Sequence, residues 1–122
     1  MRVLVVDDDP IVLASCRRVL EEKGFAVVTA ASVGAAVEQT LAQGFGLIIV
    51  DLKMPERDGL QLVQKVRTWA RPVPVIVMSG FPTPEAILSS LASGAFVFLP
   101  KPFTPDELIA ALQVVVPGEP AS

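Results

Sequence analysis

The chain has 122 residues, of which 52% are hydrophobic and 19% are charged, and its formal net charge is −3. This length suits a single domain, and the composition is typical of a folded globular protein rather than a disordered one. The acidic balance excludes a basic surface for direct nucleic-acid binding, and the absence of histidine excludes imidazole catalysis and a phosphohistidine carrier.

The lengths of the apolar segments and the position of the first acidic residues predict where the protein is located. No apolar run approaches the roughly 20 residues of a membrane-spanning helix, and the first residues turn acidic too soon for a signal peptide. The one cysteine, Cys16, cannot form an internal disulfide, and we expect it to fill space in the core. We therefore expect a cytoplasmic protein with no membrane partner.

Five short apolar runs, rich in β-branched or aromatic residues, predict the strands. In chain order they are residues 2–6, 26–30, 47–50, 73–78 and 95–99. Apolarity along these runs is continuous rather than alternating. Such strands are buried on both faces, as in a parallel sheet covered by helices.

The segments between these runs carry signals for helix ends. Three residues that can cap a helix precede a proline at the first helical position: Asp9, Thr83 and Thr104. Residues 104–107 also read as a capping box, and residues 58–61 are a similar start. Three glycines follow helical segments, where a left-handed residue would end the helix: Gly24, Gly44 and Gly94.

Strand and helix alternate five times along the chain. This alternation predicts an α/β fold: a doubly wound, flavodoxin-like sheet of five parallel strands in the order 2-1-3-4-5, with helices on both faces. We place the domain at residues 1–116. Residues 117–122, rich in proline, glycine and serine, are expected to form a flexible tail or the start of a linker.

The notable polar residues follow the ends of the predicted strands. In chain order they are Asp7, Asp8, Asp9, Asp51, Ser79 and Lys101. Ligands of doubly wound sheets bind at the carboxyl ends of the strands, where the first and third strands would be neighbours. Carboxylates brought together there repel one another unless a cation lies among them, and hard oxygen ligands with room for water favour Mg²⁺.

A site of this kind indicates phosphate chemistry. A carboxylate can act as the nucleophile towards a phosphoryl group, while Mg²⁺, a lysine and a hydroxyl neutralise the phosphoryl oxygens. Asp51, Lys101 and Ser79 fit these three roles.

Four ordered motifs make the chain resemble a known family. They are VVDDD, IIVDLKMPERDG, VIVMSG and FLPKPF, and together they are similar to the receiver domains of two-component response regulators over roughly residues 1–116. The resemblance implies that Asp51 is the phosphoacceptor and that Asp7, Asp8 and Asp51 hold Mg²⁺ with the backbone carbonyl of Lys53. It also implies that Ser79 is the switch hydroxyl and Lys101 the counter-ion of the phosphoryl group.

The resemblance further implies partners and a switching surface. The phosphodonor would be a sensor histidine kinase or a phosphotransfer protein, and the fourth helix, fifth strand and fifth helix would repack towards an output domain or protein. The domain would catalyse its own phosphorylation and dephosphorylation rather than act as an enzyme on other substrates. Receivers often pair when phosphorylated, and the sequence leaves the oligomeric state open. A cis bond is implied between Lys101 and Pro102.

One position departs from the family pattern. The residue three before the lysine, often tyrosine, is Phe98 here. We expect Phe98 to switch between exposed and buried states by packing alone, because it has no hydroxyl to hydrogen-bond. Phe81, two residues after Ser79, is expected to slow the approach of water and hence the loss of the phosphoryl group.

An alternative is a phosphatase of the haloacid dehalogenase type, with Asp7 as nucleophile and Asp9 as general acid. Such an enzyme needs a further acidic motif after the lysine and leaves Asp51 without a role. Asp9 has a simpler interpretation as a helix cap before Pro10.

Overall fold

The computed structural model describes residues 1–52, 59–69, 73–80 and 82–115. In these ranges strands and helices alternate: β1 (Arg2–Val6), α1 (Pro10–Glu22), β2 (Ala26–Ala30), α2 (Val33–Ala42), β3 (Leu47–Asp51), α3 (Leu60–Val66), β4 (Val75–Ser79), α4 (Pro84–Ser93), β5 (Val97–Pro100) and α5 (Pro105–Val115). The predicted alternation is confirmed.

The strands form one parallel sheet in the order β2-β1-β3-β4-β5, as predicted. Val6 pairs with Val50, Asp51 with Met78, and Ser79 with Pro100. This register brings the ends of β1, β3, β4 and β5 to one edge of the sheet. The polar residues that follow these strands therefore share that edge.

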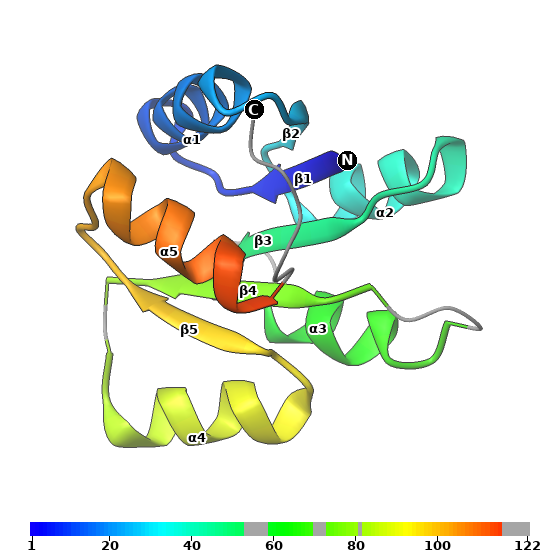
Figure 1. Cartoon of the computed structure of the whole chain (residues 1–122). Helices are drawn as coiled ribbons and strands as arrows, with labels where there is room; N and C mark the ends of the chain where they lie inside the picture. Colours follow the sequence, from blue (N-terminus) through cyan, green and yellow to red (C-terminus); the bar gives the residue numbers. More distant parts are fainter. Residues whose placement is uncertain (53–58, 70–72, 81, 116–122) are drawn as a thin grey trace.

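Helices cover both faces of the sheet, with α1 and α5 on one face and α2, α3 and α4 on the other (Figure 1). Alternate residues of each central strand supply the two cores. In β1, Val3 and Val5 belong to the core cluster on the side of α1. Leu4 and Val6 belong to the cluster on the opposite face, which includes Leu62 of α3. Burial on both faces explains why the strands are continuously apolar.

The predicted N-terminal caps are present. An Asp9 Oδ1 atom accepts a hydrogen bond from the Ile11 N–H at 2.9 Å, and the Thr83 hydroxyl accepts one from the Ala86 N–H at 3.1 Å. Thr104 and Glu107 exchange hydrogen bonds of 2.9 and 3.1 Å, which is the predicted capping box. Each cap satisfies amides that the first helical turn leaves without a partner, and contributes about 1 kcal/mol.

The glycine predictions are confirmed at two positions and wrong at one. Gly24 and Gly94 have left-handed φ angles of 91° and 119°. Gly44 does not have a positive φ, because α2 ends at Gln43, whose extended backbone still donates to the Gln39 carbonyl. The strand β5 begins at Val97 rather than residue 95, since the Ala95 N–H closes α4 by donating to the Ser90 carbonyl at 3.0 Å.

Candidate functional site

Asp7 is the buried centre of the site. It follows β1, its side chain is 0% exposed, and its N–H donates to the Ala30 carbonyl at 3.1 Å. One carboxylate oxygen accepts from the Asp9 N–H at 2.9 Å, and the other accepts from the Lys101 ammonium at 2.6 Å. Burial of a carboxylate in an apolar sheet lowers the stability of the fold unless hydrogen bonds or an opposite charge compensate it. The Asp9 N–H and the Lys101 ammonium provide that compensation.

Asp51 ends β3 beside Asp7. Its side chain is 8% exposed, and one carboxylate oxygen lies 3.4 Å from the Lys101 ammonium nitrogen. Carboxylate oxygens of Asp7, Asp8 and Asp51 all lie within 4.8 Å of one another. Asp7 and Asp51 are buried, whereas Asp8 is exposed, so the cluster opens to solvent on one side.

The donor set of this cluster fits a hard divalent cation. Carboxylates this close repel one another, so a cation among them is favourable, and the exposed side leaves room for water ligands. Mg²⁺ binds through a few carboxylates and keeps several waters, so Asp7, Asp8 and Asp51 suit it.

Lys101 is fixed by its backbone and by its charge. Its N–H donates to the Ser79 carbonyl at 2.7 Å, and the peptide bond to Pro102 is cis, as the family resemblance implied. Partial burial lowers the pKa of Lys101, but the hydrogen bond to Asp7 and the negative charges of Asp51 and Asp7 outweigh this effect and raise the pKa above its ordinary value. Lys101 therefore stays cationic at neutral pH.

Ser79 and Phe98 lie on neighbouring strands. Ser79 is the last residue of β4 and is 1% exposed, one position beyond the partner of Asp51 in the register. Phe98 of β5 is half-buried and packs against the core cluster beneath α3 and α4. The structure thus brings Ser79 to the acidic edge and places Phe98 within the sheet, towards α4.

Four predicted features lie outside the described residues. These are the Lys53 carbonyl as a metal ligand, the helix start at Asp58, Phe81, and the tail or linker at residues 117–122. Asp9 is described, and it is the α1 cap rather than a member of the carboxylate cluster.

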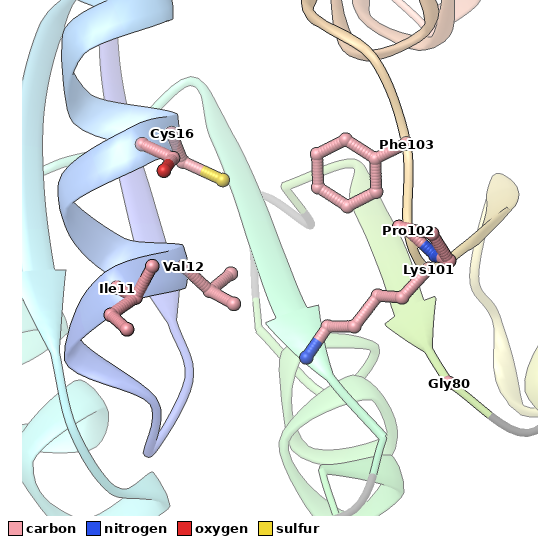
Figure 2. Close-up of a pocket in the computed structure, with 8 residues that line it drawn as sticks. Ile11, Val12, Cys16, Gly80, Lys101, Pro102 and Phe103 are labelled. Carbon is pink, nitrogen blue, oxygen red and sulfur yellow. The ribbon is translucent and has the colours of Figure 1, made fainter.

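Sequence reasoning missed an apolar pocket beside Lys101. The pocket has a volume of about 450 Å³ and lies between α1 and the segment after β5. Figure 2 shows Val12 and Cys16 on one wall, facing Lys101 and Phe103 on the other. Ile11 at its rim is 74% exposed, whereas isoleucine side chains are most often buried. No sequence motif marks this pocket, so the sequence alone could not reveal it.

Cys16 has the role in the core that the sequence predicted. It is 1% exposed, and burial, followed by the negative charge of Asp7, raises the pKa of its thiol to about 11. The thiol is therefore protonated at neutral pH and is a poor nucleophile.

The sequence of this chain is similar to those of known proteins over almost its whole length. The chain matches the family described as the response regulator receiver domain over residues 3–113. It is 37% identical over 115 residues to the transcriptional regulatory protein PrrA of Mycobacterium tuberculosis, which covers 94% of this chain and 49% of PrrA. The chain thus spans about half the length of the curated relatives it matches.

The fold of this chain is also similar to those of solved structures. The chemotaxis protein CheY4 of Vibrio cholerae superposes with a TM-score of 0.89 at 32% identity, covering 93% of this chain and 97% of CheY4. The response regulator TrrA of Thermotoga maritima, solved in complex with Mg²⁺ and BeF, gives a TM-score of 0.83 at 28% identity, covering 93% of this chain and 97% of TrrA.

The phosphatase alternative finds no support in these comparisons. Its general acid, Asp9, is an exposed helix cap whose carboxylate accepts from the Ile11 N–H, and its nucleophile, Asp7, is paired with Lys101. Among the described residues, no helix is long and apolar enough to cross a membrane. The motifs, the strand order, the acidic edge and the match over residues 3–113 together show that this chain belongs to the receiver domain family of two-component response regulators.

Proposed function

We propose that Asp51 is the phosphoacceptor of this receiver domain and that it holds Mg²⁺ together with Asp7 and Asp8. The observation that carries the proposal is the position of the Lys101 ammonium, 3.4 Å from Asp51 and 2.6 Å from Asp7 at the same edge of the sheet. A nucleophilic carboxylate, an acidic cation site and a fixed ammonium group are the parts that phosphoryl transfer to aspartate requires.

The proposed step needs little beyond positioning and charge. An Asp51 carboxylate oxygen attacks phosphorus, and an O–P bond forms as the bond from phosphorus to the histidine nitrogen of the donor breaks. That nitrogen keeps the electron pair. Lys101 stabilises the charge on the phosphoryl oxygens, and bound Mg²⁺ would supply further positive charge there. TrrA, a relative in structure, was solved with Mg²⁺ and BeF.

Phosphorylation would change the charge around Lys101. A phosphoryl group adds between one and two negative charges and three strong acceptors. Lys101, now shared by two carboxylates, would turn towards the phosphoryl oxygens, and the Ser79 hydroxyl would bind the same group. Ser79 ends β4 and Lys101 follows β5, so these movements would shift the ends of both strands. Such a shift would alter the packing of Phe98 and α4.

The surface that would respond is apolar in part. Leu88 and Leu91 of α4 are 68% and 43% exposed, and Phe96, just before β5, is 63% exposed. We propose that this surface, together with α5, binds an output domain or protein, or a second phosphorylated copy of the chain. Exposed large apolar side chains grouped on one face are typical of interaction sites.

The phosphodonor would approach from another side. The pocket between Val12, Cys16 and Phe103 opens beside Lys101, and Ile11 stands exposed at its rim. We propose that a sensor histidine kinase or phosphotransfer protein places an apolar side chain here while its histidine reaches Asp51. The domain would then catalyse only its own phosphorylation and dephosphorylation. Its cytoplasmic location stays a prediction from sequence.

The test is to incubate the chain with a small acyl phosphate, with and without Mg²⁺, and to map the adduct by intact mass and peptide analysis. We expect one Mg²⁺-dependent phosphoryl group on Asp51, and none in Asp51→Asn. An adduct on Asp7 would instead support the phosphatase chemistry. No adduct on the wild-type chain would contradict the proposed function.

A further inference from the structure

Gly59 occupies a crowded position against the phosphoacceptor. It lies immediately before α3, and its N–H donates to the Leu52 carbonyl at 2.8 Å, one residue beyond Asp51. A Cβ atom added to Gly59 would overlap the carbonyl oxygen of Asp51, and it would lie 3.0 Å from both the Asp51 carbonyl carbon and a Val50 methyl group. Cβ atoms in proteins essentially never lie closer than 3.0 Å to another heavy atom of this kind, as the added Cβ would to the Asp51 carbonyl oxygen.

Backbone conformation does not require a glycine here. Gly59 has φ −57° and ψ −20°, an ordinary right-handed helical conformation that alanine adopts readily. By contrast, Gly94 has φ 119°, which L-residues rarely adopt. The need for glycine at residue 59 therefore comes from close approach to Asp51 and not from conformational freedom.

Neither side of this contact can move without disturbing buried structure. The Leu52 N–H donates to the Met78 carbonyl at 2.8 Å, which holds the end of β3 against β4. On the other side, Leu62 and Val63 of α3 are 0% exposed, and their amides donate to the Gly59 carbonyl at 3.0 and 3.3 Å. A methyl group at residue 59 must displace one of these two elements, because well-packed cores absorb little extra volume.

We propose that Gly59 is a positioning residue that fixes the backbone of Asp51, and through it the Asp51 carboxylate, relative to Asp7 and Asp8. The inference rests on the proposed function, in which these three carboxylates hold Mg²⁺ and Asp51 accepts the phosphoryl group. Their oxygens lie within 4.8 Å of one another, so a backbone shift of a fraction of an ångström at Asp51 changes the cation site directly.

The test compares three variants. Gly59→Ala introduces the overlap, whereas Gly44→Ala adds the same methyl group at a position where nothing lies within 4 Å and φ is not positive. Val66→Ala removes packing from the far end of the same helix, where Val66 is 2% exposed, and controls for lost stability. Mg²⁺ affinity is measured by calorimetry, unfolding by denaturant titration, and the environment of Asp51 by the NMR shift of its amide.

We expect Gly59→Ala to weaken Mg²⁺ binding about ten- to a hundred-fold, as lost support of metal ligands typically does, and to shift the Asp51 amide signal. Gly44→Ala and Val66→Ala should bind Mg²⁺ as the wild type does. If Gly59→Ala does not fold, the titration is repeated in a stabilising osmolyte. Wild-type Mg²⁺ affinity in Gly59→Ala, or an equal loss in Val66→Ala, would overturn the positioning role.

These readouts separate the two proposals. A wild-type chain that binds Mg²⁺ but takes no phosphoryl group on Asp51 overturns the proposed function, and the Mg²⁺ comparison still tests Gly59. A wild-type chain that is phosphorylated on Asp51, with Gly59→Ala unchanged in Mg²⁺ affinity, overturns the role of Gly59 alone.

Discussion

Lys101 lies closer to Asp7 than to the proposed phosphoacceptor: its ammonium nitrogen is 2.6 Å from an Asp7 oxygen and 3.4 Å from an Asp51 oxygen. Asp7 is also a proposed ligand of Mg²⁺. If Asp7 binds Mg²⁺ as proposed, the lysine and the metal ion would compete for the same buried carboxylate before phosphorylation, and the phosphoryl group on Asp51 would draw Lys101 away from it.

This competition predicts opposite effects of Lys101→Met on two quantities. Mg²⁺ affinity should rise by roughly fivefold, which corresponds to about 1 kcal/mol for a partly exposed ion pair, because a competing cation is lost. The rate of phosphorylation by an acyl phosphate should fall, because no ammonium remains to stabilise the phosphoryl oxygens. Calorimetry and rapid-quench kinetics measure the two quantities. Lys65→Met, which removes an exposed lysine of α3, is the charge-matched control and should change neither.

Cys16 predicts a loss of stability at alkaline pH. The pKa of its thiol is raised from 9.0 to about 11 in the folded chain, so the unfolded chain releases this proton first as pH rises. The stability due to the protonated thiol is complete below pH 9 and is lost between about pH 9 and 11, a change of up to roughly 3 kcal/mol. Denaturant unfolding at several pH values measures it, and Cys16→Ala should show a smaller slope over this window. Equal slopes would contradict the assignment to Cys16.

Ser79→Ala separates phosphorylation from switching. The variant should still take a phosphoryl group on Asp51, because Asp51 and Lys101 are unchanged. NMR shift changes in α4 and β5 on phosphorylation should shrink several-fold, because no hydroxyl remains at the end of β4 to bind the phosphoryl oxygens. Unchanged shifts relative to the phosphorylated wild type would show that Ser79 does not carry the signal, and Asp51→Asn gives the baseline without phosphorylation.

Arg67 ties α3 to α4. Its guanidinium donates to the Ala92 carbonyl at 3.2 Å, and its aliphatic stem fills the space where a Gly94 side chain would lie. Arg67→Ala should therefore speed hydrogen exchange in the last turn of α4 and lower the free energy of unfolding by about 1 kcal/mol. Arg17→Ala, an exposed substitution on α1, is the control. Unaltered exchange in α4 would show that the helix is held by its apolar face alone.

Much of this protein follows from local chemistry. The apolar runs predict the strands because strands buried on both faces must be apolar throughout, and Asp9, Thr83 and Thr104 predict helix starts because a cap satisfies amides within three residues of itself. Gly44 shows the limit of such reasoning. The helix α2 ends at Gln43, which has an extended backbone and donates its N–H to the Gln39 carbonyl. A helix can end with an extended residue or with a left-handed glycine, and the residue types at this position do not decide between the two.

The tertiary structure decided the relationships between residues far apart in the chain. The acidic edge was predicted once the strand order was assumed, but the preference of Lys101 for Asp7, the pocket between α1 and Phe103, and the contact of Gly59 with Asp51 were not. Motifs and helix caps depend on neighbours along the chain and can be recognised from sequence. Distances of a few ångströms across the sheet depend on how whole elements pack, and only the folded chain sets them.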